Sequence, residues 1–569
     1  MSTLLLIIRR FSTILNFALS VLSVLTLFFY LLYFGGDLPK WAEPLFPLFQ
    51  EGVLTIFIVD MVLQFVLSRP KSLYFRDHLI DWIILIPWIF TAEVTYSVPL
   101  ILIRQGFWTW RSFTATKTAV TLLADFRRYP AKMLAGSFFA VISMGTILLV
   151  FPIATHKTGG MDLIDALFTV TSATCVTGLS IYDTYSYFTP FGQGVILALI
   201  QIGGLGMMTL SSAVAVILGE KLTIRNRVLL QDILEETNVE DFKQLLITIL
   251  RTTLTIELVG ALILTLNWKE ELGSWGKSIY FGVFHSISAF CNAGFALFPD
   301  SLMQFSSDGV TTFTMTTLII LGGVGFPVLA GLLHSRFWSR DPAKRKAISI
   351  HTKLALMISL ILLVAGATFL FFVEFSHAFA NLDMSTRIQV AWFQSVTPRT
   401  AGFNTISLNA LTQSSQFLLI VLMFIGASPG STGGGIKTTT FGVLMLAFLA
   451  MLRGREDVEC FGRRVPVNII NKSIAILMSG FGVVTLGVLF LLMTEVSYPL
   501  MTVLFEAMSA FGTVGLSLGL TPYLSDVGKI LVSVLMFIGR IGPLTLAFIV
   551  GQQLSVAHYR YPYGKVMVG

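Results

Sequence analysis

Charged residues are scarce in this chain of 569 residues, and their scarcity excludes an ordinary soluble domain. Asp, Glu, Lys and Arg make up 12% of the residues and apolar types 55%, whereas an average soluble domain is about 25% charged. Uncharged stretches long enough to cross a bilayer recur. They include residues 11–36, 133–156, 184–219, 309–335, 354–373 and 473–494. We therefore predict an all-α membrane protein that crosses the bilayer many times.

Cysteine and histidine are also rare, which argues against disulfide, metal and hydrolytic chemistry. The three cysteines, Cys175, Cys291 and Cys460, form neither a disulfide framework nor a zinc-ligand spacing. The seven histidines are scattered, and no H-E-x-x-H motif occurs. We expect no enzymatic activity and no cofactor bound to this chain.

Basic residues exceed acidic ones, and the net charge is +7. They gather in short connections such as Arg336, Arg340 and residues 344–346, which indicates cytoplasmic loops rather than a surface for nucleic acid. Arg9 and Arg10 precede the first apolar run, and no small-residue cleavage site follows that run. We expect a retained first helix with its N-terminus inside the cell, and no nucleic-acid partner.

One short motif occurs four times in the chain. The segments "FTVTSATCVTGL", "FHSISAFCNAGF", "WFQSVTPRTAGF" and "FEAMSAFGTVGL" align on Gly178, Gly294, Gly402 and Gly515, about 110 residues apart. A second glycine landmark follows each of them after about 25 residues, at Gly203, Gly322, Gly426 and Gly539. Because the two glycine motifs follow each other at a similar spacing four times, we predict four repeats. Each would contain an apolar span (M1), a short pore helix, a glycine loop and a second apolar span (M2).

The apolar segments just before the first set of glycines are too short to cross a hydrocarbon core of about 30 Å, so they must enter the membrane and return. Non-helical backbone at that depth is tolerated where it lines a wet cavity. The loops carry mostly small neutral side chains, so main-chain carbonyls are the available ligands and a dehydrated monovalent cation is the expected guest. The alternative is that these glycines only permit close helix packing. The predicted cation-binding residues are Cys175, Val176, Thr177, Gly178, Cys291, Asn292, Ala293, Gly294, Arg399, Thr400, Ala401, Gly402, Gly512, Thr513, Val514 and Gly515.

The third M2 span is interrupted by "FIGASPGSTGGGIKTTTF", residues 424–441. A phosphate-binding loop is excluded because Ile436 stands where that motif requires lysine. Proline and clustered glycines break a helix, so we predict two half-helices joined by a flexible gating loop, with a simple kink as the alternative. Arg540, inside an uncharged interval, is expected to repel cations and to hold carbonyls of this loop rather than to reach the interface or form an inert pair. The predicted gate residues are Gly426, Pro429, Gly430, Gly433, Gly434, Gly435, Lys437 and Arg540.

Other polar residues in the predicted membrane segments are expected to support the loops. Glu506 of the fourth pore helix and Arg399 of the third loop are expected to pair behind them. His285 is expected to be a hydrogen-bonded packing residue rather than a proton relay. Asp162 and Asp165 are expected to cap the first pore helix.

These motifs resemble those of the Trk/Ktr/HKT family of potassium transporters, most closely its KtrB-type membrane subunits. The resemblance is carried by the loops of "SA-x-C-x-x-G" type, by "LIQIGGLGMM" and "GASPGSTGGGIKTTT", and by the closing "YRYPYGKVMVG". It implies four M1-pore helix-M2 repeats with pseudo-fourfold symmetry, a homodimer in the bacterial plasma membrane, and a cytosolic KtrA-type ring that carries the regulatory nucleotide. It also implies potassium selectivity, because a serine in the first loop goes with sodium and position 178 is glycine. Sodium is a candidate activator.

Residues 1–128 precede the repeats and are predicted to form four further spans, at roughly 12–34, 48–68, 79–93 and 98–123. Residues 56–89, with Asp60 and Asp81, resemble two helices of a voltage-sensor domain. Basic residues in the fourth span are sparse, namely Arg104, Arg111 and Lys117, so we expect a structural bundle rather than a working sensor. The remaining predicted parts are repeats at 129–225, 226–345, 346–460 and 461–558, and a cytoplasmic tail at 559–569.

The sequence thus predicts passive, potassium-selective uptake through a carbonyl-lined filter, gated by the loop in the third M2 span. The alternative is an alternating-access carrier coupled to sodium or protons. Such carriers tend to contain inverted repeats and paired broken helices, whereas this sequence repeats in one orientation and interrupts one M2 span. No soluble dinucleotide fold is evident, so nucleotide control is expected from the partner. The expected docking segments are 219–246, 335–347, 453–467 and the tail.

Overall fold

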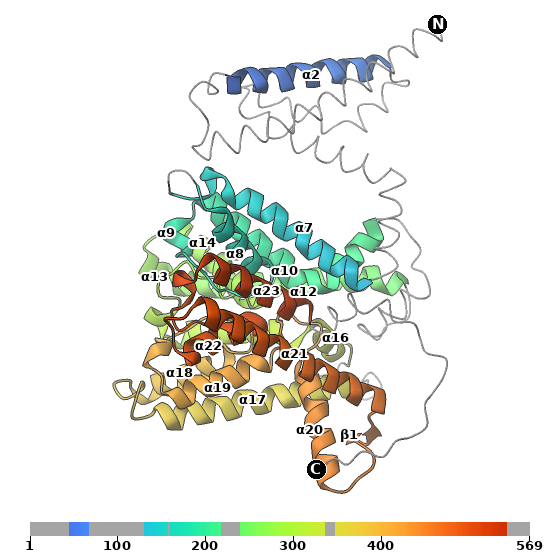
Figure 1. The fold of residues 1–569 in the computed structure, drawn as a ribbon, viewed down its shortest axis with the longest axis vertical. Coiled ribbons are helices and arrows are strands. Elements are labelled where there is room, and N and C mark those ends of the chain that lie inside the picture. Colours follow the sequence, from blue (N-terminus) through green and yellow to red (C-terminus); the bar gives the residue numbers. More distant parts are fainter. Residues whose placement is uncertain (1–44, 68–129, 158–159, 218–238, 336–346, 543–569) are drawn as a thin grey trace. The chain divides into compact units, whose positions relative to one another are not determined.

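The computed structural model describes residues 45–67, 130–157, 160–217, 239–335 and 347–542 of the chain. These residues are almost entirely helical, and Figure 1 shows the helices together with one small two-stranded sheet. The chain divides into two compact units. One comprises Met1–Tyr129 with Val150–Met161, and the other comprises Pro130–Leu149 with Asp162–Gly569.

In the first unit the described elements are α2 (Leu45–Leu67) and the short 3₁₀ helix η1 (Pro152–Ala154). Helix α2 coincides with the second of the predicted N-terminal spans. Its buried residues Val53, Leu54 and Phe57 lie on one face, as the spacing of an amphipathic helix requires. Outside the described residues lie the other three predicted spans, the side chain of Asp60, and Arg9, Arg10, Asp81, Arg104, Arg111 and Lys117.

The second unit alternates long and short helices along the chain. The helices that precede a short helix are α7 (Pro130–Val150), α12 (Val239–Asn267), α17 (Ile350–Glu374) and α21 (Val467–Thr494). The short helices are α8 (Leu163–Thr174), α14 (Trp275–Cys291), α18 (Met384–Val396) and α22 (Leu500–Gly512). The helices that follow are α10 (Pro190–Ile217), α15 (Gly309–Val324) with α16 (Phe326–Ser335), α19 (Gln413–Phe424) with α20 (Thr438–Leu452), and α23 (Asp526–Ile541).

Smaller elements connect these helices. They are α9 (Thr184–Tyr187), α13 (Lys269–Leu272), η2 (Met303–Phe305), η4 (Leu408–Ala410) and η5 (Thr521–Tyr523). Strands β1 (Glu459–Cys460) and β2 (Arg463–Arg464) form an antiparallel hairpin between α20 and α21. This hairpin occupies one of the expected docking segments, whereas most of 335–347 and the whole tail lie outside the described residues.

Three helices of the described chain are long and apolar enough to cross a membrane. They are Ile247–Asn267, Ile350–Glu374 and Val467–Thr494, with mean hydropathies of 1.8, 2.7 and 2.4. Large apolar side chains lie on their outer surfaces, since Phe372 and Met493 are 71% and 74% exposed. Apolar surface of this extent is costly in water and suits contact with lipid.

The short helices α8, α14, α18 and α22 contain 12, 17, 13 and 13 residues. At 1.5 Å per residue the longest spans about 26 Å, which is less than a bilayer core. Each packs against the helix that follows the preceding short helix in the chain: α14 against α10, α18 against α15, α22 against α19, and α8 against α23. The last of these contacts joins the two ends of the series, so the packing is cyclic.

Within the described residues, two of the helices that follow a short helix are interrupted, where the sequence predicted only one. Residues 425–437 separate α19 from α20, as expected from their glycines and proline. In addition, α15 and α16 meet at a bend of 97°. Gly325 lies at this bend with φ of +94°, a conformation that only glycine adopts without strain. The expectation of a single broken M2 span is therefore wrong.

Candidate functional site

The four segments that follow the short helices share one backbone pattern. In each segment the loop glycine and the residue two positions before it have positive φ, with one residue between them. These pairs are Val176 and Gly178 (58° and 94°), Asn292 and Gly294 (61° and 71°), Thr400 and Gly402 (77° and 81°), and Thr513 and Gly515 (50° and 92°). Alternation between left-handed and other conformations turns successive peptide groups to the same side of the chain. Each loop can therefore direct several carbonyl oxygens toward one point.

The four loop glycines neighbour one another in a closed cycle. A Cβ atom added to Gly178 would lie 3.0 Å from Cα of Gly294, and one added to Gly294 would lie 3.0 Å from Cα of Gly402. A Cβ atom added to Gly402 would lie 3.3 Å from Cα of Gly515, and one added to Gly515 would lie 3.1 Å from Cα of Gly178. Each added Cβ would also collide with a carbonyl oxygen of the next loop: that of Ala293, Ala401, Val514 or Thr177. The ring has no room for side chains at these four positions.

Hydrogen bonds hold each loop to its own short helix. The hydroxyls of Ser172 and Ser509 each accept from the N–H of the loop glycine, at 3.1 Å from Gly178 and Gly515. In the other two loops the hydroxyl donates to the carbonyl after the glycine: Ser288 to Phe295 at 2.8 Å and Thr397 to Phe403 at 2.5 Å. The predicted cation-binding residues of these loops are buried, except that Gly178, Gly294 and Gly515 are half-buried. Their conformation is fixed from the side that faces away from the ring.

The second set of predicted glycines lies against the ends of the short helices. A Cβ on Gly203, Gly322 or Gly539 would collide with the last carbonyls of the adjacent short helix, those of Thr174, Phe290 and Phe511 respectively. Gly426 departs from this pattern because a Cβ there would collide with the carbonyl of Gly434, inside the interrupting segment itself. The glycine landmark thus has a packing role in three segments. In the third segment the residues between α19 and α20 take the place of the helix end.

This intramembrane loop, residues 425–437, contacts several other segments of the site. The N–H groups of Ser428 and Thr432 donate to the carbonyls of Gly323 and Gly322 in α15, at 3.0 and 3.3 Å. The N–H of Gly434 donates to the hydroxyl of Thr513 in the fourth loop at 3.0 Å. The loop therefore lies directly beside the ring of glycine loops.

Further contacts fix the ends of the intramembrane loop. The carbonyl of Gly430 accepts from Phe326 N, just after the bend between α15 and α16, at 3.0 Å. Nζ of Lys437 donates to the carbonyl of Gly433 within the loop at 2.6 Å. Ile425 and Ile436 form a parallel bridge that closes its base. Gly433 lies against the Thr400 side chain of the third glycine loop.

Arg540 is buried next to this loop, with 1% of its surface exposed. Its two terminal nitrogens donate to the carbonyl oxygens of Thr432, in the intramembrane loop, and of Gly203, in α10. No carboxylate pairs with it in the described part of the chain, and its Nε has no partner there. The guanidinium of Arg540 therefore binds a carbonyl of the intramembrane loop, as the sequence predicted, and places a positive charge among backbone carbonyls. Its second bond joins this loop to α10, which the sequence did not predict.

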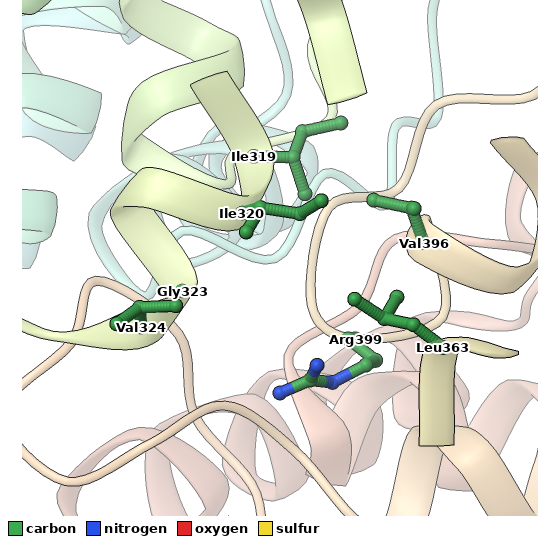
Figure 2. A pocket seen from close by; sticks show the side chains of 7 residues that line it. All are labelled: Ile319, Ile320, Gly323, Val324, Leu363, Val396 and Arg399. Carbon is green, nitrogen blue, oxygen red and sulfur yellow. The ribbon is translucent and has the colours of Figure 1, made fainter. Parts of the chain in front are cut away.

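The predicted pair of Glu506 and Arg399 does not form. Arg399 turns toward α17, where its guanidinium donates to the carbonyl and hydroxyl of Ser359 at 3.3 and 2.9 Å. Figure 2 shows it beside a small pocket whose other lining residues are Ile319, Ile320, Gly323, Val324, Leu363 and Val396. Glu506 instead accepts hydrogen bonds from the hydroxyls of Ser517, at 2.7 Å, and Thr521. The pairing prediction failed because each side chain faces its own segment rather than the space between segments.

Two further expectations have mixed outcomes. His285 is confirmed as a hydrogen-bonded packing residue, with Nδ1 2.8 Å from the Phe281 carbonyl and Nε2 accepting from Leu297 N at 3.2 Å. Asp162 is the residue before α8, but its side chain makes no capping bond there. Asp165 does not cap the helix either: it forms an ion pair with Lys529 of α23 at 2.6 Å.

A buried carboxylate behind the second loop was missed by the sequence reasoning. Glu257 of α12 accepts from Nε2 of Gln201 at 3.1 Å, and the thiol of Cys291 lies 3.9 Å from its Oε1. Gln201 is also 3.7 Å from the same thiol. The isolated acid inside the apolar run "LTIELVGALIL" is the signal that could have identified it. Glu257 and Gln201 fix the side chain of a predicted cation-binding residue.

Comparison with known proteins agrees with this arrangement. The family described as TrkH, Cation transport protein, matches residues 103–555. The chain is 41% identical to Ktr system potassium uptake protein B of Bacillus subtilis (strain 168) over 442 residues, which cover 77% of this chain and 97% of that protein. It is 39% identical to the Vibrio alginolyticus protein of the same name (76% and 93%) and 35% identical to Potassium/sodium uptake protein NtpJ of Enterococcus hirae (78% and 98%).

The fold is also that of a solved structure. The potassium transporter TrkH from Vibrio parahaemolyticus superposes with a TM-score of 0.56 at 19% identity, over 73% of this chain and 85% of that one. The family match spans most of the chain, and the relatives are aligned over nearly their whole length. This chain is therefore a multi-pass membrane protein that belongs to the TrkH family of cation transport proteins, and it is a transporter rather than an enzyme.

Proposed function

We propose that this chain takes up potassium ions across the bacterial plasma membrane through a filter formed by the four glycine loops. The observation that carries the proposal is the closed cycle of Gly178, Gly294, Gly402 and Gly515. Loops that meet around one point, with backbones that turn carbonyls to one side, can replace the hydration shell of a monovalent cation. The names of the relatives, potassium and potassium/sodium uptake proteins, support potassium as the cargo.

The proposed architecture has four M1-pore helix-M2 repeats around this filter, with pseudo-fourfold symmetry. The cyclic packing of α8, α14, α18 and α22 supports it. The proposed boundaries are 129–225, 226–345, 346–460 and 461–558, followed by a cytoplasmic tail at 559–569. Residues 1–128 are proposed to form an additional membrane domain of four helices.

The intramembrane loop is the proposed gate. Its contacts with α15, with Thr513 and with Arg540 support a closed state in which it lies next to the filter. Opening would require the Arg540 bond to the Thr432 carbonyl to break. The proposed gate residues are Gly426, Pro429, Gly430, Gly433, Gly434, Gly435, Lys437 and Arg540.

Regulation is proposed to come from outside the chain. The Ktr systems named for the relatives support a KtrA-type ring that binds the nucleotide and docks on the cytoplasmic side of a homodimer of this chain. Sodium is proposed as an activator, and the name of the Enterococcus hirae relative supports its involvement.

An alternating-access carrier is the competing function, and the bend of 97° between α15 and α16 favours it because carriers use paired broken helices. Reversal potentials measured on the full chain in planar bilayers separate the two. A potassium-selective pore follows the potassium Nernst potential, whereas a coupled carrier does not. A reversal potential that ignores the potassium gradient would contradict the proposed pore.

A further inference from the structure

Each pore helix makes a polar contact with the segment that follows its glycine loop, here called the outgoing limb. The four contacts have different chemistry. They are the Tyr182 hydroxyl to Asp165 at 2.6 Å, Leu297 N to Nε2 of His285 at 3.2 Å, Nε2 of Gln394 to the Thr405 hydroxyl at 3.5 Å, and the Ser517 and Thr521 hydroxyls to Glu506. All four loops are thus supported from behind, but by groups that differ in charge.

The contact made by Glu506 contains a negative charge, and no cationic side chain pairs with this charge in the described part of the chain. The other acidic member, Asp165, forms an ion pair with Lys529 at 2.6 Å. The two arginines nearest to the loops are bound elsewhere, Arg399 to Ser359 and Arg540 to backbone carbonyls. One hydroxyl donates to each oxygen of the Glu506 carboxyl, an arrangement that suits a carboxylate, which only accepts hydrogen bonds.

The position of Glu506 brings this charge close to the ring of glycines. Its side chain is fully buried, and its partner Ser517 follows Gly515 by two residues. Two residues of chain span at most about 7 Å, so the carboxylate lies on the order of 10 Å from the Gly515 backbone. A charge at that distance in a water-poor interior acts strongly on a cation in the ring.

We propose that Glu506 is a specificity-determining positioning residue of the fourth loop, and that the cation held in the filter balances its charge. It fixes the outgoing limb through Ser517 and Thr521, and it adds negative potential on one side of the ring. The inference rests on the proposed potassium filter. Two unit charges about 10 Å apart, at an effective dielectric constant of about 20, interact with an energy equivalent to about a tenfold change in affinity.

The test compares Glu506→Gln with Glu495→Gln in the full-length chain reconstituted into liposomes. Glutamine keeps the size of the side chain and removes its charge. Glu495 is the matched control because it is also buried and accepts from the backbone N–H and the hydroxyl of Ser525, at 3.1 and 2.5 Å. That contact holds the N-cap residue of α23 and involves no residue of the glycine loops. The measurements are the KM for potassium, the uptake ratio of potassium to sodium, and the unfolding midpoint in potassium chloride and in sodium chloride.

Glu506→Gln is expected to raise the KM for potassium about tenfold, to lower the uptake ratio and to reduce the extra stability that potassium gives over sodium. Glu495→Gln is expected to lower the unfolding midpoint in both salts equally and to leave KM and the ratio unchanged. Unchanged KM and ratio in Glu506→Gln would overturn the inference. If that variant does not fold, Ser517→Ala removes one donor and is expected to shift the KM in the same direction, and no shift would overturn it. Wild-type protein that does not prefer potassium would instead contradict the proposed filter itself.

Discussion

Replacing Arg540 with alanine is expected to raise cation flux, because this side chain holds the intramembrane loop to α10. When the loop moves, the bond from the guanidinium to the Thr432 carbonyl must break, while the bond to Gly203 can remain. A hydrogen bond from a charged donor contributes about 1.5 to 3 kcal/mol. At about 1.4 kcal/mol per factor of ten, its loss favours the open loop by about 10- to 100-fold. Removing the positive charge also lowers the electrostatic barrier to a passing cation.

The assay is potassium uptake into liposomes that contain the full-length variant without a regulatory partner. Arg540→Lys serves as the control, since lysine keeps the charge but cannot donate to two diverging carbonyls with a planar fork. An intermediate flux is expected for it, below that of the alanine variant. Correctly folded Arg540→Ala protein with wild-type or lower flux would refute the assignment of Arg540 as the residue that holds the gate.

Three other changes test the loops and their supports. Gly178→Ser should weaken potassium over sodium selectivity by about 1 to 3 kcal/mol, because its Cβ displaces a carbonyl of the next loop; reversal potentials measure this, and unchanged selectivity would contradict the filter. Gly203→Ala should lower the stability by about 1 to 3 kcal/mol, because its Cβ would collide with the Thr174 carbonyl. Gly194→Ala in the same helix, where nothing lies within 4 Å of an added Cβ, should be neutral or stabilising. Equal unfolding midpoints for the two variants would refute the packing argument. Lys529→Met should lower the free energy of unfolding by about 3 to 5 kcal/mol, because it leaves Asp165 buried without its cation. Adding Asp165→Asn should restore part of this stability. No recovery of the unfolding midpoint in the double variant would argue against the ion pair.

Local sequence signals predicted the parts of this fold that depend on backbone chemistry. The length of the uncharged apolar stretches identified the spans. The regular spacing of the glycines identified four loops, and in each of these loops the same two positions have positive φ. The interrupted third M2 span followed from Pro429 and its neighbouring glycines. These signals work because proline and glycine act on the backbone at their own positions, whatever the rest of the chain does.

Features that depend on the direction of side chains could not be predicted in this way. Arg399 follows its short helix and faces α17, whereas Glu506 lies within its short helix and faces its own outgoing limb. The bend at Gly325 was missed because one glycine among several in an apolar run gives no local sign of positive φ. Its cause is tertiary, since the carbonyl of Gly430 in the third repeat accepts the N–H of Phe326 that the bend exposes.

The bond between Phe326 and Gly430 connects the start of α16 directly to the proposed gate. Because the bend turns α16 away from the axis of α15, a displacement of α16 would act on the intramembrane loop at the Gly325 bend, where Phe326 N binds the Gly430 carbonyl. That route does not pass through the glycine ring. In the proposed transporter, substitutions in the glycine loops would therefore alter ion selectivity, whereas substitutions at the Gly325 bend would alter gating.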